Sequence, residues 1–175
     1  MTIKRVVLLV FIFSLLGLSG YFLSDKILKR QKKKEAYSSI PDFQLLDIQG
    51  NRISGKSLKK HSFVMFVYFC PDCDLCVNEL TEISLHQSAL ETGQMVFFSS
   101  LSSDSTSRFL KEIDFVPASN MLFLSDEKES LCSQLEVRMS PSIYFYRKGK
   151  LHKRFEGSVK IETIIQFFSE NNELN

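Results

Sequence analysis

The fold of this chain is indicated by one stretch, in which three cysteines stand three residues apart: Phe69-Cys70-Pro71-Asp72-Cys73-Asp74-Leu75-Cys76. The apolar run just before the cysteines, residues 62–69, is typical of a buried strand. After them, Leu75, Leu80 and Ile83 recur at roughly helical spacing. The sequence therefore predicts a strand that passes through the cysteines into a helix reaching about residue 90.

The position of Cys73 favours reactive thiol chemistry. It lies at the N-terminus of the expected helix, where unpaired N–H groups and the positive end of the helix dipole stabilise a thiolate. A cysteine three residues later lies one turn on and can resolve a mixed disulfide. Two pairings fit this spacing, Cys73/Cys76 and Cys70/Cys73, and the spacing alone leaves the choice open.

Strands and helices alternate through the rest of the chain. The pattern predicts a β-hairpin over residues 40–54 turning at Gly50, strands over 95–98 and 121–124, helices over 108–113 and 128–135, a closing hairpin of strands 142–146 and 150–155, and a final helix over 161–168. This order predicts an α/β fold in which a central mixed sheet is flanked by helices.

Motifs spread over residues 41–168 fit one family pattern. They are Pro41-Asp42-Phe43 followed by Asp47 and Gly50, the strand-to-CxxC junction, Glu79, the run Val137-Arg138-Met139-Ser140-Pro141-Ser142, and Gly149 and Gly157. Together they resemble the thioredoxin fold, and more narrowly the membrane-tethered TlpA/ResA-like redoxins related to the AhpC/TSA group. The resemblance implies a thioredoxin fold with an N-terminal β-hairpin extension, and a thiol-disulfide oxidoreductase activity.

The resemblance also favours one cysteine pairing. The family has a glutamate three residues after the second active-site cysteine, and Glu79 has that position relative to Cys76. With Cys70/Cys73 as the pair, Glu79 would lie on another face of the helix. We therefore expect Cys73 to be the nucleophile, Cys76 the resolving thiol and Glu79 a proton acceptor or donor for Cys76. The chain departs from the family pattern in having Asp72 where a tryptophan usually precedes the nucleophile.

The resemblance implies a substrate-binding role for Ser140 and Pro141. Pro141 matches the family's cis-proline opposite the CxxC motif, and the exposed backbone of Ser140 would pair with a substrate peptide. Cys70 is expected either to fill a small-residue position as a packed thiol or to act as a third redox partner. Cys132 lies in a helical apolar stripe and is expected to be buried in the core.

Two carboxylates predict the direction of electron flow. Asp72 and Asp74 flank Cys73, and their like charge opposes formation of the Cys73 thiolate. A less stable thiolate means a more stable disulfide, so the sequence favours a reductant toward its substrates. Asp74 has an alternative role, because an acidic residue in the first turn also stabilises the helix dipole.

The N-terminal segment predicts export. Residues 6–23 contain no charge and follow Lys4 and Arg5, which predicts a signal anchor or transmembrane segment over residues 1–25, a basic linker over 26–39 and a thioredoxin-like domain over 40–175. A cleaved signal peptide remains an alternative. The basic linker argues for a cytoplasmic domain by the positive-inside rule, whereas the resemblance implies a single-pass protein of the cytoplasmic membrane with its domain facing the periplasm or cell exterior.

The expected partners follow from the same resemblance. They are protein thiols or disulfides, for example in cytochrome c maturation, and a membrane-embedded thiol electron donor. The net charge of +2 gives no reason to expect nucleic acid binding, and the scattered histidines predict no metal or other cofactor. Alternatives are a copper-binding module using Cys70, Cys73 and Cys76, a peroxidase, which needs Thr or Ser three residues before its reactive cysteine, and a non-catalytic assembly factor.

Overall fold

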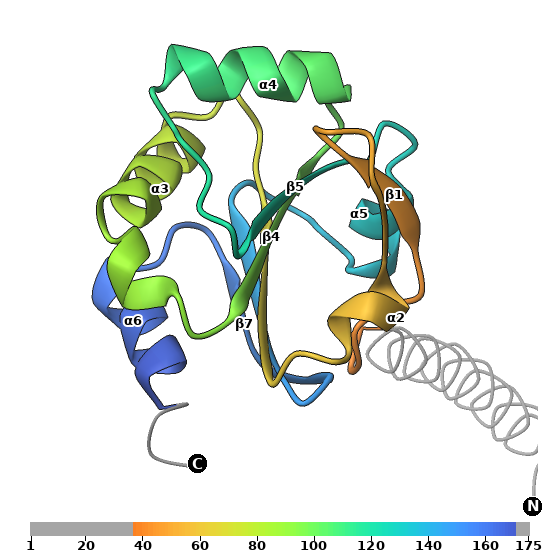
Figure 1. Ribbon diagram of the computed structural model, residues 1–175, viewed down its shortest axis with the longest axis vertical. Helices are drawn as coiled ribbons and strands as arrows, with labels where there is room; N and C mark the ends of the chain where they lie inside the picture. The colour runs from red at the N-terminus through yellow and green to blue at the C-terminus, as the bar shows by residue number, and fades with distance from the viewer. Residues whose placement is uncertain (1–36, 171–175) are drawn as a thin grey trace, which may run out of the picture. The chain divides into compact units, whose positions relative to one another are not determined.

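The computed structural model describes residues 37–170, which form a seven-stranded mixed sheet with helices on both faces (Figure 1). The strand order is β2-β1-β5-β4-β3-β6-β7. Strands β3, β4 and β5 are mutually parallel, and the other neighbours pair antiparallel. The strands are β1 (Gln44–Asp47), β2 (Arg52–Ser54), β3 (Phe63–Tyr68), β4 (Gln94–Ser99), β5 (Met121–Ser125), β6 (Ser142–Arg147) and β7 (Lys150–Glu156). The predicted central mixed sheet is confirmed.

The predicted helices are present with different ends, and a short helix over Gly55–Leu58 was not predicted. The helices are α2 (Gly55–Leu58), α3 (Asp74–Leu85), α4 (Ser103–Glu112), α5 (Ser130–Gln134), α6 (Ile161–Ser169) and the 3-10 turn η1 (Gln87–Leu90). The helix expected to reach residue 90 is divided at His86, whose backbone leaves the helical region. Helix α4 begins five residues earlier than expected, because Ser102 caps it by accepting a hydrogen bond from the Ser105 N–H.

The apolar run before the cysteines forms a central strand that is covered on both faces. Successive side chains of β3 point to opposite faces of the sheet. Phe63, Met65 and Val67 pack in the cluster that includes α3, α4 and α6, whereas Val64 and Phe66 pack in the cluster that includes α2 and α5. Figure 1 shows α3 and α6 on one side of the sheet, with α2 and α5 on the other. This double burial explains why the run is continuously apolar.

The expected N-terminal hairpin is present and joins the edge of the sheet. Strands β1 and β2 pair through Leu45 and Ile53, and β1 continues the sheet by pairing with β5. The Asp47 carboxylate accepts hydrogen bonds from the Gln49 and Asn51 N–H groups at 2.9 and 2.8 Å. Gly50 has a φ of +85°, a backbone conformation that glycine adopts without steric cost because it has no Cβ atom.

The folded domain begins by Tyr37. The Tyr146 hydroxyl donates to the Tyr37 carbonyl oxygen at 3.0 Å, and the Ile40 N–H donates to the Gly149 carbonyl oxygen at 3.0 Å. Residues 37–39 of the expected linker therefore belong to the domain. The rest of that linker and the expected segment over 1–25 lie outside the described residues. Within residues 37–170, no helix combines the length and apolar character needed to cross a membrane.

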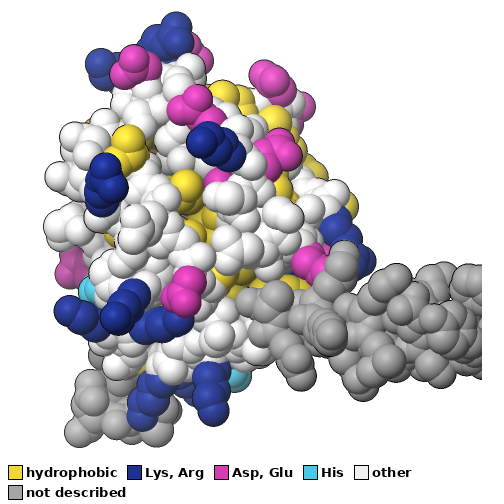
Figure 2. Space-filling model, turned by 90° about the vertical axis from the view of Figure 1, so that its right-hand side faces the viewer, with side chains coloured by type: hydrophobic (Ala, Val, Ile, Leu, Met, Phe, Trp, Pro, Cys, Tyr) yellow, Lys and Arg dark blue, Asp and Glu magenta, His cyan; other side chains and the backbone are white. Residues whose placement is uncertain are grey.

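Exposed lysines lie near this attachment point of the chain. They come from α2 and the loop after it, and from the β6–β7 turn, where the Lys148 N–H donates to the Ser62 carbonyl oxygen. On the face shown in Figure 2, Lys and Arg side chains gather in the lower part, at the end that carries this turn. The exposed lysines of these segments are Lys56, Lys59, Lys60, Lys148 and Lys150. The β6–β7 turn lies beside the N-terminal end of β3, whereas the cysteines follow its C-terminal end.

Candidate active site

Cys73 lies at the N-terminus of α3, as the sequence predicts. It is the N-cap residue, with φ −114° and ψ 109°, and its carbonyl oxygen accepts from the N–H groups of Cys76 and Val77 at 2.9 and 3.1 Å. The helix therefore begins directly after Cys73. This placement puts the thiol beside the positive end of the helix dipole, which favours its thiolate form.

The loop that carries the cysteines is fixed by Phe69. The Phe69 N–H donates to the Phe98 carbonyl oxygen in β4 at 3.1 Å. Its buried ring stacks on Phe109, with centroids 5.6 Å apart, and meets the edge of Phe123. The turn after it closes through the Cys73 N–H, which donates to the Cys70 carbonyl oxygen at 3.3 Å. The reactive loop is thus held by the aromatic core below it.

Cys76 is fully buried behind the partly exposed Cys73. The pKa of the Cys76 thiol is raised to about 12, chiefly by burial and to a smaller extent by a hydrogen bond to Cys73, while the Cys70 N–H, 3.4 Å from the Cys76 sulfur, partly offsets this rise. All four cysteines among the described residues are free thiols. The two members of the pair therefore differ in access, and only the more exposed Cys73 can meet a bulky substrate.

Cys70 and Cys132 take different places. Cys70 is partly buried against the core, and it contributes its backbone N–H to Cys76, a contact that no sequence pattern signals. Cys132 was expected to be buried in the core, and this was wrong, because it is only partly buried beside the second core cluster. Helix α5 has five residues, so only one turn of it can pack on the sheet. Its buried face is filled by Leu131.

Glu79 is buried one turn beyond Cys76. Its side chain is 4% exposed, and its carboxylate accepts a hydrogen bond from the Val159 N–H at 2.9 Å. Burial raises the pKa of Glu79 to about 7, partly offset by that hydrogen bond. A carboxyl group that titrates near neutral pH can both take and return a proton under physiological conditions.

Replacing Glu79 with glutamine should remove a pH dependence of stability. In the unfolded chain a glutamate titrates near pH 4.5, and in the fold Glu79 titrates near 7, so folding favours the protonated form. The stabilisation is complete below pH 4.5 and is lost as the pH rises through 7, which costs the wild type about 2 to 3 kcal/mol between pH 5 and pH 8. Urea unfolding at these two pH values measures the difference.

The matched control for this prediction is Glu112→Gln. Glu112 is exposed at the C-terminal end of α4 and forms no ion pair within the described domain, so its replacement should leave the pH dependence of the wild type unchanged. A Glu79→Gln variant that loses stability between pH 5 and pH 8 as the wild type does would contradict the raised pKa of Glu79.

Ser140 and Pro141 face the nucleophile. The peptide bond between them is cis, and the Cys73 thiol donates to the Ser140 carbonyl oxygen at 3.6 Å. The Ser142 hydroxyl donates to the Met139 carbonyl oxygen at 2.7 Å, and the Pro141 carbonyl oxygen accepts from the Gly157 N–H at 2.8 Å. Within residues 37–170, no acceptor is found for the Ser140 N–H. This group is placed to pair with an extended peptide that approaches Cys73.

Arg154 in β7 positions the loop that leads to Ser140, and sequence reasoning missed it. Its guanidinium donates to the Glu136 carbonyl oxygen at 2.7 Å and lies 5.2 Å from the ring centroids of Tyr37 and Tyr144. The Tyr144 hydroxyl donates to the Leu135 carbonyl oxygen at 2.9 Å. A charged residue in an edge strand carries no sequence signal for this role, because its contacts come from distant segments.

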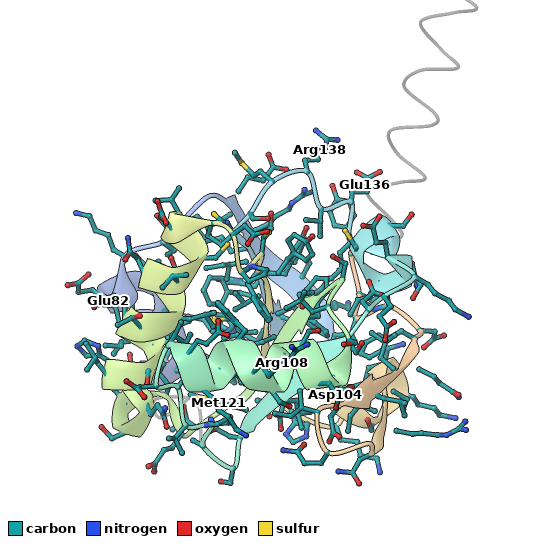
Figure 3. The ribbon with its side chains drawn as sticks, turned by 90° about the horizontal axis from the view of Figure 1, so that it is seen from above. Glu82, Asp104, Arg108, Met121, Glu136 and Arg138 are labelled. Carbon is teal, nitrogen blue, oxygen red and sulfur yellow. The ribbon has the colours of Figure 1, made fainter. Side chains whose placement is uncertain are left out.

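The charges around Cys73 are unevenly balanced. Asp72 and Asp74 are exposed, and neither forms an ion pair with another residue of the described domain. Arg138 lies 3.7 Å from the Glu136 carboxylate, and Figure 3 shows both on the loop before β6. The described residues contain no group of three His, Cys, Asp or Glu side chains arranged to hold a metal ion.

Comparisons with known proteins identify a family and a fold. The model of the AhpC/TSA family matches residues 37–154. A comparison with curated proteins finds no match. Among solved structures, a secreted disulfide oxidoreductase of Mycobacterium tuberculosis homologous to E. coli DsbE is 16% identical with a TM-score of 0.64, over 78% of this chain and 98% of that one.

Two further structures show the same architecture. An exposed lipoprotein thioredoxin of Streptococcus pneumoniae is 21% identical with a TM-score of 0.61, over 74% of this chain and 98% of that one. A peroxidoxin of Mycobacterium tuberculosis is 13% identical with a TM-score of 0.64, over 75% of this chain and 94% of that one. The predicted thioredoxin fold is confirmed by these likenesses.

Proposed function

This chain belongs to the AhpC/TSA family and is a thiol-dependent oxidoreductase, and we propose that it exchanges disulfides with protein cysteines through the pair Cys73 and Cys76. One observation carries the proposal. The partly exposed Cys73 lies at a helix N-terminus, 3.6 Å from the Ser140 carbonyl oxygen, with the buried Cys76 hydrogen-bonded behind it. A nucleophilic thiol, a resolving thiol and a peptide-pairing backbone are thus combined at one point.

The first half of the cycle takes place at Cys73. Its thiolate attacks one sulfur of a substrate disulfide, the substrate S–S bond breaks, and the departing thiolate takes a proton from water. The product is a mixed disulfide between Cys73 and the substrate. Because Ser140 adjoins Cys73, its free N–H holds the substrate backbone beside the reacting sulfur.

The second half takes place at Cys76. Its high pKa keeps it protonated until Glu79 accepts the proton, and the resulting thiolate attacks the Cys73 sulfur. The mixed disulfide breaks and the second substrate thiolate leaves. The substrate has gained two electrons, and the protein holds a Cys73–Cys76 disulfide. A dithiol donor, such as a membrane-embedded thiol relay, reduces that disulfide and closes the cycle.

The direction of flow and the location belong to the same proposal. Asp72 and Asp74 oppose the Cys73 thiolate, which favours the disulfide form and makes the protein a reductant. The uncharged residues 6–23 tether the domain to the cytoplasmic membrane, with the domain facing the periplasm or cell exterior. Supporting this location, two of the compared proteins are described as secreted and exposed. Its substrates there are exported proteins, apocytochrome c among them.

Trapping tests the proposal. Cys76→Ala in the native cells removes the resolving thiol, so mixed disulfides with substrate proteins should accumulate on Cys73 and disappear after reduction. A Cys76→Ala chain that also carries Cys73→Ala should trap nothing. Adducts that form on Cys70 instead would overturn the assignment of the pair. Rapid turnover of hydrogen peroxide, with no exchange of protein disulfides, would replace this function by a peroxidase.

A further inference from the structure

Two exposed apolar side chains flank the candidate nucleophile. Only five large apolar side chains among the described residues are strongly exposed, and two of them adjoin the site: Leu75, 51% exposed, and Met139, 49% exposed. Leu75 lies between the two active cysteines in the first turn of α3. Met139 directly precedes Ser140, whose carbonyl oxygen contacts Cys73. The Cys73–Ser140 contact therefore joins the two segments that display these side chains.

The backbone that displays Met139 is fixed. Its carbonyl oxygen accepts from the Ser142 hydroxyl, and the loop is held a few residues earlier by Arg154 at the Glu136 carbonyl oxygen. On the other side, Leu75 belongs to a regular helix. Both apolar side chains thus project from a fixed backbone and leave about half of their surface exposed, as is typical of a recognition surface.

The charge beside this apolar pair is negative. The exposed carboxylates of Asp72 and Asp74 have no ion-pair partner within residues 37–170, whereas Arg138, which directly precedes Met139, pairs with Glu136 at 3.7 Å. Two uncompensated negative charges next to an attacking thiol attract cationic partners and repel anionic ones.

We propose that this surface selects the substrate, which is a cationic protein segment with an apolar residue next to its cysteine. The proposal rests on the proposed disulfide exchange at Cys73 and names the substrate class for it. Leu75 and Met139 take the apolar neighbour, and Asp72 and Asp74 take a Lys or Arg within a few residues. A small anionic disulfide such as oxidised glutathione fits poorly, because its carboxylates meet those of Asp72 and Asp74 and it has no apolar side chain.

Four peptides test this selection on the reduced full-length protein. Each carries one cysteine in a disulfide with the same small thiol, and they combine Leu or Ser next to the cysteine with Lys or Glu two residues away. In single-turnover exchange the Lys peptides should react about 10-fold faster than the Glu peptides at low ionic strength, and about 2-fold faster at high salt. The Leu peptides should react about 5-fold faster than the Ser peptides. Oxidised glutathione should be slower than the peptide with Leu and Lys.

Variants separate recognition from chemistry. The double variant Asp72→Asn, Asp74→Asn should abolish the preference for Lys over Glu, and Leu75→Ser should reduce the preference for Leu over Ser. Leu85→Ser is the matched control, since Leu85 is 72% exposed at the far end of the same helix, and it should change neither ratio. Because each ratio compares two peptides on one variant, any effect of a substitution on Cys73 reactivity cancels.

The outcomes divide clearly. Equal rates for the four peptides, faster reaction of the Glu peptides, or ratios that survive in the aspartate and leucine variants would each overturn the substrate class. If none of the four peptides undergoes disulfide exchange, the result would contradict the proposed function itself rather than the substrate selection.

Discussion

Cys73→Ser is expected to lower the rate of disulfide exchange by at least about 10³-fold, because a serine hydroxyl does not replace a thiolate as nucleophile toward sulfur. Cys76→Ser should behave differently. Its Cys73 can still attack once, so the single-turnover rate should remain within a few-fold of the wild type while multiple turnover is lost. Stopped-flow exchange with a disulfide-linked peptide, followed by steady-state turnover with a dithiol donor, measures both rates.

Cys70→Ser is the control for these two variants. The contribution of Cys70 to the site is its backbone N–H, 3.4 Å from the Cys76 sulfur, and serine retains that group. We therefore expect single-turnover and steady-state rates within about 3-fold of the wild type, as for a substitution that removes no reacting group. If Cys70→Ser were as inactive as Cys73→Ser, the reaction would have to be assigned to the pair Cys70/Cys73 instead.

Phe69→Ala is expected to destabilise the domain by about 4 kcal/mol, the usual cost of removing a fully buried aromatic ring. The ring is 1% exposed and lies between the aromatic core and the cysteine loop. Its loss should also loosen the loop that brings the Cys70 N–H to Cys76. Alkylation of Cys76 in the native protein should therefore accelerate, by about 10-fold if the local opening costs about 1.4 kcal/mol less.

Phe66→Ala is the matched control for this effect. Phe66 lies in the same strand with an equally buried ring, but it faces the cluster on the other side of the sheet. Urea unfolding should show a similar loss of stability, without the added alkylation of Cys76. Equal alkylation rates in the two variants would show that Phe69 does not hold the cysteine loop. If Phe69→Ala does not fold, the same two measurements can be compared between Phe69→Leu and Phe66→Leu.

Local patterns were sufficient to predict the centre of the fold. Three adjacent patterns predict this region: the apolar run of β3, the spacing of the cysteines and the helical repeat after Cys73. Because they are neighbours in sequence, they predict the strand, the loop and the helix in that order. The start of α4 was predicted too late, because the first turns of this helix are rich in serine and lack an apolar repeat. The hydrogen bond by which Ser102 caps the helix stabilises these turns instead. The resemblance to a family placed Glu79 and Pro141, which local periodicity alone could not assign.

The remaining parts of the site depend on backbone groups and on distant contacts. The Val159 N–H reaches Glu79 across 80 positions of the chain, and Arg154 reaches the Glu136 carbonyl oxygen across 18. Backbone N–H groups are present at every residue except proline, so sequence does not mark the ones that face a thiol or a carboxylate. Burial of Glu79 likewise follows from the packing of α3, which only the assembled fold defines.

The attachment of Ile40 beside Gly149 has a practical consequence. Residue 40 contacts the β6–β7 turn, which lies next to the N-terminal end of β3. The cysteines follow the C-terminal end of β3, which is about 17 Å away because the strand has six residues. A bead, chip or carrier protein joined ahead of residue 37 would therefore be held at the end of the domain remote from Cys73. Immobilised in that way, every copy would present its thiols outward, and bulky folded proteins could be reduced in flow over the support.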